Sequence, residues 1–395
     1  KFLWLFAALA FVFSACNEEG LFHLIDEDQI DRATYEQVEG SIQLLEGLQL
    51  PTLMLDDLVN SDLTVFGETH YVQEHHEFLV SILPLLSELG YRVIFDELFH
   101  AMSWAVEDYT LGELDELPEY VRFFNQELIE GLRSFNATVD EEKRIRLVYF
   151  DINHWGDNLI ESLELIETVL GHQELFIGIK NQSPNSQTYE QALYHLSEEL
   201  VDRESVLRSS LGDLWYERLI DIVKVEMISL EFCLARDDVA REEQMFRNIM
   251  AVCSNDMSNK HLVNTGMSHA QKVNYMSGNT TRIAAMLADE IERVHTISFI
   301  GLRGERKFRF YETETFTFDL VQASQNNDMT KYLAEFSGTK RSYMPLDHDH
   351  FSENLQRISY TQGTTVFAHV GVQFDAIFTY PEISVLRSMD EFDWE

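Results

Sequence analysis

The chain has 395 residues, of which 45% are hydrophobic and 25% charged, and this composition excludes a disordered protein. The length suits one large α/β domain with insertions. Asp and Glu number 68 against 29 Lys and Arg, a net charge of -39, so the surface repels phosphate backbones and we expect no nucleic-acid partner.

The N-terminal segment differs from everything after it. Residues 2–12 are almost wholly apolar, a run too short to span a bilayer and typical of an export signal. The run ends in Phe-Ser-Ala-Cys at 13–16, which resembles the lipobox of bacterial lipoproteins. We therefore predict a lipoprotein signal peptide over 1–16, with Cys16 lipidated and the mature protein held to a membrane without spanning it. An ordinary signal peptide cleaved before Cys16 is the alternative.

The segment after Cys16 predicts both a tether and a location. Residues 17–35 are polar and acidic and are expected to form a flexible tether. Glu18 and Glu19 resemble the acidic pair that directs some lipoproteins to the cell surface. We expect a bacterial envelope protein, at the outer membrane or the cell surface.

From residue 36 to 395 the pattern predicts a single domain in which strands and helices alternate. Short apolar runs that end at Gly, Asp or Glu predict buried strands. Apolar residues at helical spacing lie between them. This alternation indicates an α/β fold with a mostly parallel central sheet covered by helices on both faces. The predicted strands are 63–66, 92–95, 145–150, 176–179, 261–265 and 296–300, and the predicted helices are 72–89, 101–135, 157–170 and 280–292.

Two regions depart from simple alternation. Residues 187–253 are predicted to be wholly helical, a long insertion that forms a lid over the strand ends or packs outside them. The last ninety residues are strand-rich, with strands at 308–318, 364–370 and 374–380 and a short helix at 328–335. Cys233 and Cys253 lie in the helical insertion and are expected to be buried free thiols, with a single disulfide as the alternative.

Acidic and imidazole side chains follow four of the predicted strands. In parallel sheets ligands bind beyond the carboxyl ends of the strands, so these side chains should share one rim. A lone Asp after a strand is often a helix N-cap, which is the alternative for Asp96 and Asp151, and a lone loop His is often a surface residue. The joint occurrence at four strand ends favours a functional site. The residues are Glu68, His70, Asp96, Glu97, Asp151, His154 and His269.

His75 and His76 add two imidazoles about one turn into the helix that follows His70. Converging imidazoles and carboxylates suit two chemistries: activation of water by a general base, and binding of a divalent metal. A solvent-facing helix start is the alternative for this pair. Other catalytic templates are absent from the sequence, including GxSxG, HExxH, a Walker A loop and GxGxxG after a strand.

Several of these motifs together resemble one superfamily. Residues 65–70 (Val-Phe-Gly-Glu-Thr-His), followed by the His75-His76 pair and by Phe-Asp-Glu at 95–97, are similar to the superfamily that joins erythromycin esterases, ChaN-like haem-binding lipoproteins and TIKI proteases. Residues 241–248 resemble its Arg-x-x-x-Met-x-x-Asn helix and residues 266–269 its second Gly-x-x-His element. Residues 374–378 are similar to the closing strand of the esterase branch.

The resemblance implies roles for five residues. His70 would be the general base or a metal ligand, Glu68 and Glu97 would orient it or share a metal, and His269 would be the second imidazole. Arg241 would pair with a carboxylate or bind substrate; a surface helix salt bridge is its alternative.

Two functions follow from these observations. The favoured one is a lipid-anchored hydrolase, ester-hydrolase-like, that acts on a small molecule through Glu68, His70, Glu97, Arg241 and His269, with or without a metal held by Glu68, His70, Glu97 and His269. The alternative is a haem- or metal-binding lipoprotein of iron uptake that uses His75 and His76 and performs no catalysis. A surface protein with an inactive site is a third possibility.

Overall fold

The computed structural model describes residues 27–387 except 48, 119–120, 123–124, 154–156, 173–174, 185, 236–237, 257, 274–279, 308–314, 320–328, 354–355, 362–363 and 369. The predicted signal peptide, Cys16, Glu18, Glu19 and His154 lie outside the described residues. None of the described helices is long and apolar enough to cross a membrane.

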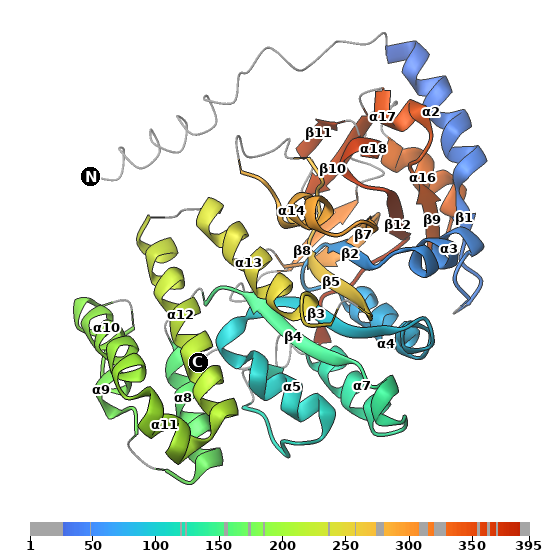
Figure 1. The fold of residues 1–395 in the computed structure, drawn as a ribbon. Helices are drawn as coiled ribbons and strands as arrows, with labels where there is room; N and C mark the ends of the chain where they lie inside the picture. Colours follow the sequence, from blue (N-terminus) through green and yellow to red (C-terminus); the bar gives the residue numbers. More distant parts are fainter. Residues whose placement is uncertain are drawn as a thin grey trace, which may run out of the picture.

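One eight-stranded sheet forms the centre of the fold (Figure 1), in the order β1-β9-β12-β6-β2-β5-β3-β4. Six neighbouring strands, from β12 to β4, run parallel, whereas β9 pairs antiparallel with both β12 and β1. This confirms the predicted α/β fold with a mostly parallel sheet. The bounds are β1 Gln43–Leu44, β2 Leu63–Glu68, β3 Tyr91–Phe99, β4 Arg146–Asp151, β5 Lys260–Gly266, β6 Val294–Gly301, β9 Ser342–Pro345 and β12 Ala376–Tyr380.

The central strands are buried on both faces, which is why their sequences read as continuous apolar runs. All six residues of β2 are buried. Phe66 belongs to one hydrophobic core and Val65 to the other, because successive side chains point to opposite faces. One core is closed by α3 Thr52–Asn60, α4 Gln73–Glu88, α5 Ser103–Leu111 and α7 Gln126–Asn136, and the other by α13 Asp238–Cys253, α14 Ile283–Glu290 and α16 Met329–Ser337.

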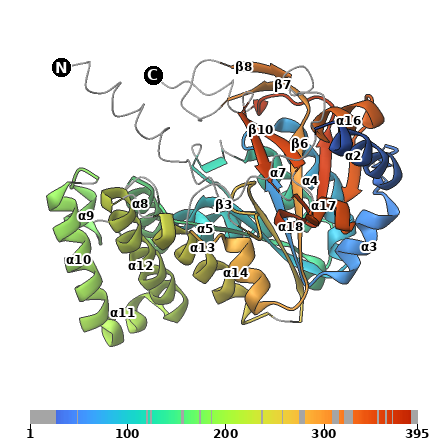
Figure 2. The same cartoon turned by 90° about the horizontal axis from the view of Figure 1, so that it is seen from above.

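The predicted helical insertion is present as α10 Gln187–Asp202, α11 Glu204–Leu211, α12 Asp213–Ala235 and α13. With α8 Asp157–Leu170, helices α10 to α12 form a layer beyond the β4 side of the sheet (Figures 1 and 2). Arg218 on α12 donates two hydrogen bonds of 2.9 and 2.7 Å to Asp108 on α5. Asn153, two residues past β4, donates to Glu226 on α12 over 2.7 Å. The insertion is therefore bonded to both α5 and the exit of β4.

Two segment predictions are wrong. The predicted strand 176–179 is the short helix α9 Ile177–Lys180, held against α8 by bonds from the Phe176 amide and Lys180 Nζ to Glu167. An apolar run of four residues does not distinguish a strand from a buried helical turn. The predicted tether 17–35 ends early, because α2 Glu27–Ser41 packs the Tyr35 ring on α16 at centroid distances of 5.4 and 4.9 Å.

The strand-rich C-terminal part is also present where it is described. Beyond β9 and β12, it contains the antiparallel pairs β7 Arg303–Arg306 with β8 Phe316–Asp319 and β10 Gln356–Thr361 with β11 Thr364–Ala368. The predicted strand 364–370 is shorter than expected, since α18 Val370–Gln373 begins there. Cys253 is a buried free thiol, as predicted.

Candidate active site

Four parallel strands deliver the predicted polar residues to one edge of the sheet. Because β2, β5, β3 and β4 are adjacent, their carboxyl ends lie next to one another. The turn after β5 also contacts the end of β2, where the Met267 amide donates to the Glu68 carbonyl over 2.9 Å. Helix α13 adds Arg241 from the side, and the side chains of the five main candidates meet at this edge.

His70 is the accessible imidazole of the group. Its Nδ1 lies 3.0 Å from Glu68 Oε1, and its side chain is 44% exposed against 8% for Glu68. Partial burial opposes protonation of the ring, but the hydrogen bond with Glu68 and the negative charges of Glu97 and Glu68 outweigh it and raise the pKa of His70 to about 9. Despite its own burial, the pKa of Glu68 is lowered by the same bond and by the nearby histidines. Glu68 and His70 therefore form an oriented carboxylate–imidazole pair.

Two glycines make room for this pair. A Cβ on Gly266 would lie 2.6 Å from His70 Nε2, so the imidazole rests directly on the backbone of that residue. A Cβ on Gly67 would lie 2.6 Å from the Ala270 Cβ and 3.2 Å from the Met267 Cα. The glycines of both motifs are thus required by close approach of the two strand exits.

A distant segment holds the loop that follows His70. Tyr71 has a φ of 65°, a left-handed conformation that is uncommon outside glycine. The Leu386 amide donates to the Tyr71 carbonyl and the Gln73 amide to the Ser384 carbonyl, each over 3.0 Å. Glu74 accepts two further bonds of 2.7 Å from Ser384. No local motif in the sequence marks this segment, residues 383–387, as part of the site.

Glu97 is the most highly connected carboxylate of the site. Its Oε2 accepts bonds of 2.6 Å from both Thr265 Oγ1 and the Gly266 amide, while its Oε1 accepts from Arg241 Nη2 over 2.8 Å and lies 3.3 Å from His269 Nε2. Burial favours its neutral form, but the positive charges of His269, His70 and Arg241 lower the pKa of Glu97 to about 2. Glu97 is consequently an ionised carboxylate between three basic side chains.

Arg241 joins two of the strand exits. Besides Glu97, it binds Asp151 at the end of β4 through Nε at 3.0 Å and Nη2 at 2.7 Å. The Arg241 side chain is 17% exposed, and although burial alone would lower its pKa, the Asp151 and Glu97 carboxylates raise it. The surface salt-bridge alternative is therefore wrong for Arg241, and Asp151 is not a helix cap, since α8 begins only at Asp157.

His269 has a carboxylate partner that sequence analysis missed. Its Nδ1 lies 2.7 Å from Oε1 of Glu242, the residue after Arg241 on α13. Glu242 also accepts from Arg282 Nη1 and, over 3.0 Å, from the Ile283 amide at the start of α14. The sequence did contain an indication of this role, because Glu242 lies inside the Arg-x-x-x-Met-x-x-Asn motif.

His75 and His76 are buried, so the alternative of a solvent-facing helix start is wrong. The His75 side chain is 1% exposed, with Nε2 at 2.8 Å from Asn264 Oδ1 and Nδ1 at 3.2 Å from the Tyr380 hydroxyl. Burial lowers the pKa of His75, and it lowers that of His76 to about 4. These are interior polar groups of α4, and their geometry does not support the predicted role as haem ligands. Haem binding itself stays an untested prediction.

Asp96 belongs to the same interior network and is not a helix N-cap. It accepts from Asn264 Nδ2 over 2.8 Å and from Asn125 Nδ2 over 2.6 Å. Burial raises the pKa of Asp96 to about 7. Asp96 and Glu97 are adjacent in sequence, yet only Glu97 faces the candidate site.

The four predicted metal ligands are not arranged around a common ion position among the described residues, and metal binding stays a prediction. Each is already engaged within the protein, as the contacts of Glu68, His70, Glu97 and His269 show. Across the described part of the chain, no group of three or more His, Cys, Asp or Glu side chains is arranged to hold a metal. We therefore derive no chemical step through a metal at this site.

Comparison with known proteins places the fold. No family model and no curated protein matches the sequence. Among solved structures, a mutant of erythromycin esterase EreC in its open conformation matches with a TM-score of 0.62 and 16% identity, over 87% of this chain and 98% of that one. The chain has the erythromycin esterase fold. This confirms, at the level of fold, the resemblance predicted from the motifs.

Two further structures share this erythromycin esterase fold. A protein from Bacillus cereus has a TM-score of 0.66 at 14% identity, over 91% of this chain and 98% of that one. A succinoglycan biosynthesis protein has a TM-score of 0.67 at 13% identity, over 91% of this chain and 99% of that one. At these identities the likeness shows a shared fold, and activity must be argued from the site.

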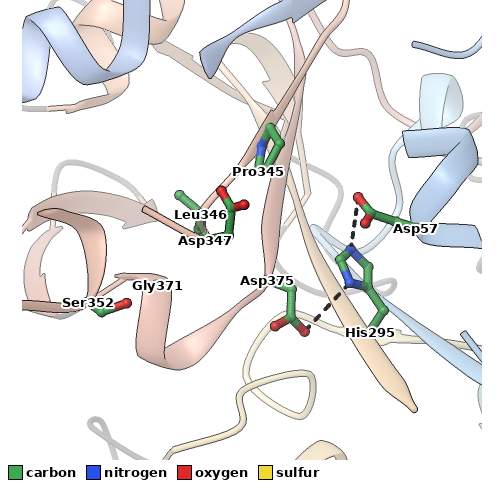
Figure 3. A pocket seen from close by; sticks show the side chains of 8 residues that line it. All are labelled: Asp57, His295, Pro345, Leu346, Asp347, Ser352, Gly371 and Asp375. Atoms are coloured by element: carbon green, nitrogen blue, oxygen red, sulfur yellow. Dashed lines mark ion pairs between the residues drawn. The ribbon is translucent and has the colours of Figure 1, made fainter. Parts of the chain in front are cut away.

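A separate cavity lies beside the amino ends of β6 and β12 (Figure 3). Its volume is about 260 Å³, and His295 near the start of β6 lies between Asp57, at 3.6 Å, and Asp375, at 4.0 Å. None of the predicted site residues lines this cavity. The candidate active site is therefore the cluster at the carboxyl ends of the strands.

Proposed function

We propose that the protein is a hydrolase that cleaves esters of small molecules, with His70 activating the attacking water. The observation that carries the proposal is the Glu68–His70 pair: a 44% exposed imidazole whose Nδ1 is held at 3.0 Å by a buried carboxylate. An imidazole oriented in this way is a typical general base, and such groups contribute about 10²–10⁴-fold to reaction rates.

We propose the following direction for the proton transfer. With the proton on Nδ1 held by Glu68, Nε2 of His70 accepts a proton from water, and the resulting hydroxide attacks the ester carbonyl. The imidazolium is stabilised by Glu68 and by the ionised Glu97, and it then donates its proton to the leaving alcohol. A raised pKa makes His70 a stronger base, at the cost of a smaller neutral fraction at pH 7.

Arg241 is suited to the oxyanion of the tetrahedral intermediate. Its Nε and Nη2 are committed to Asp151 and Glu97. The contacts among described residues leave Nη1 available to donate to a developing negative charge. A fixed guanidinium of this kind acts as a preorganised donor.

The test is a pair of histidine substitutions measured on a panel of carboxylic esters. We expect His70→Gln to lower kcat/KM by at least about 10²-fold, because it removes the base. His195→Gln is the matched control, since that histidine is 75% exposed on α10. Equal activity of His70→Gln and the control would contradict the proposal.

We further propose that the hydrolase works at the bacterial envelope, anchored through a lipid on Cys16. The support for this is the apolar run at 2–12 and the lipobox-like sequence at 13–16.

A further inference from the structure

A second carboxylate–imidazole pair lies behind the first. His269 is 8% exposed and Glu242 is 2% exposed, with 2.7 Å between Nδ1 and Oε1. The other nitrogen of the ring, Nε2, lies 3.3 Å from Glu97 Oε1. His269 therefore lies between two carboxylates, one inside the protein and one in the candidate site.

Glu242 determines which atom His269 presents to Glu97. An ionised carboxylate only accepts hydrogen bonds, so its contact with Nδ1 requires a proton on Nδ1 and fixes the plane of the ring. Nε2 is then directed at Glu97. A ring released from Glu242 could rotate about its Cβ–Cγ bond and leave Glu97 with Arg241, Thr265 and Gly266 as partners.

The position of Glu97 in turn affects His70. The negative charge of Glu97 is one of the causes of the raised pKa of His70. His269 offsets part of that charge and helps to keep Oε2 of Glu97 on Thr265 and Gly266, directly below the His70 ring. The contacts thus run from Glu242 through His269 and Glu97 to the His70 imidazole.

We propose that Glu242 is a positioning residue of the active site, which acts on His70 through His269 and Glu97. The inference rests on the proposed function for its kinetic consequence, but its structural core concerns only the His269 ring. Glu242 touches no substrate, since its side chain is buried against Arg282 and the first amide of α14.

Glu242→Gln tests the inference, because it keeps the shape, removes the charge and replaces one acceptor by a donor. Glu243→Gln is the matched control: the same change one residue away, on a side chain that is 49% exposed and bonded to Arg247. We expect kcat to fall by about 10²-fold in Glu242→Gln with KM little changed, since a misplacement of about 1 Å in a catalytic group has this cost. We also expect the rising limb of the pH–rate profile, which reports His70, to move to higher pH.

A spectroscopic measurement separates this inference from the proposed function. In ¹⁵N-labelled protein, the Nδ1 proton of His269 should be visible as a hydrogen-bonded resonance that shifts upfield or disappears in Glu242→Gln, where one amide oxygen must serve three donors, and that is unchanged in Glu243→Gln. If the wild-type protein cleaves no ester, the proposed function fails while this resonance still tests the positioning of His269. An unchanged resonance in Glu242→Gln would overturn the inference, whatever the activity.

A second variant guards against a loss of folding. Glu242→Asp keeps the negative charge near Arg282 and α14 but withdraws the carboxylate from Nδ1. We expect it to fold and to retain a kcat between those of the wild type and Glu242→Gln. A fully active Glu242→Asp without the Nδ1 resonance would also overturn the inference.

Discussion

Gly266→Ala provides a sharp test of the site geometry, because the added methyl group points at the imidazole and at little else. The new Cβ would lie 2.6 Å from Nε2 and 3.0 Å from Cε1 of His70. Carbon and nitrogen atoms pack at about 3.5 Å, so the ring must move by about 1 Å. That displacement is expected to lower kcat about 10²-fold, which corresponds to about 2.7 kcal/mol of transition-state stabilisation.

The same substitution should leave stability almost unchanged. The displaced group is the end of a side chain that is 44% exposed, so the ring can swing toward solvent. We expect the free energy of unfolding to change by less than about 0.5 kcal/mol. Gly67→Ala should show the opposite pattern, since its Cβ would meet the Ala270 Cβ and the Met267 backbone, and overpacking of this kind costs about 1–3 kcal/mol.

The assay combines ester hydrolysis with urea unfolding for Gly266→Ala, Gly67→Ala and Gly178→Ala. Gly178 is the control, because a Cβ there would meet no atom within 4 Å. A Gly266→Ala protein with wild-type kcat would refute the placement of His70 on the Gly266 backbone. A Gly266→Ala protein destabilised as much as Gly67→Ala would refute the idea that only the ring moves.

Four further predictions follow from the site and its surroundings. As a base with a pKa of about 9, His70 should give a kcat that rises with pH up to about pH 9 in a pH–kcat profile. Glu68→Gln should move the midpoint of this rise toward pH 6.5. His76 has a pKa of about 4 in the folded protein against 6.5 for the unfolded chain, so stability present above pH 6.5 is lost as the pH falls through 4. The full loss is about 3 kcal/mol. His76→Leu should remove most of this pH dependence, as measured by urea unfolding at pH 7 and pH 4. Arg241→Met removes the cation that binds two buried carboxylates, Glu97 and Asp151, and should lower the free energy of unfolding by about 3–5 kcal/mol in the same assay, whereas a loss below 1 kcal/mol would contradict the buried ion pair. Cys16→Ser in the exported protein should abolish incorporation of labelled fatty acid and release the protein from the membrane fraction; continued labelling would disprove lipidation at Cys16.

The central strands were predictable because strands buried on both faces have continuously apolar sequences. In β2 and β4 nearly every residue is buried, so a continuous apolar run identifies each strand, and the rule for parallel sheets then places Glu68, Glu97 and Asp151 at one edge. Residues 176–179 have the same local character but form a helix, since a contact with Glu167 on α8 decides their conformation. Strand β9 escaped prediction for a related reason: four residues with a terminal proline carry little periodicity.

The interior polar groups could not be predicted from local pattern. The start of α4 reads Gln-Glu-His-His, which indicates a solvated surface, yet His75 is buried because Asn264 and Tyr380 satisfy both of its ring nitrogens. These partners lie 189 and 305 residues away in sequence. Glu242 illustrates the same limit, since only the fold shows that it faces His269 whereas its neighbour Glu243 faces solvent.

The segment 383–387 has a consequence for the order in which activity appears. It holds the backbone around Tyr71 and Gln73 through bonds that bridge about 310 positions of sequence, such as that between Ser384 and Glu74. A chain that emerges N-terminus first, from the ribosome or from an export channel, can pair β3 with β4, and then β5 with both β2 and β3, before this segment arrives. Such contacts between distant parts of a chain form late in folding. Most of the sheet can therefore be assembled before the loop that carries His70 is held in place, so that the proposed hydrolysis should begin only after residues 383–387 have been synthesised and bound.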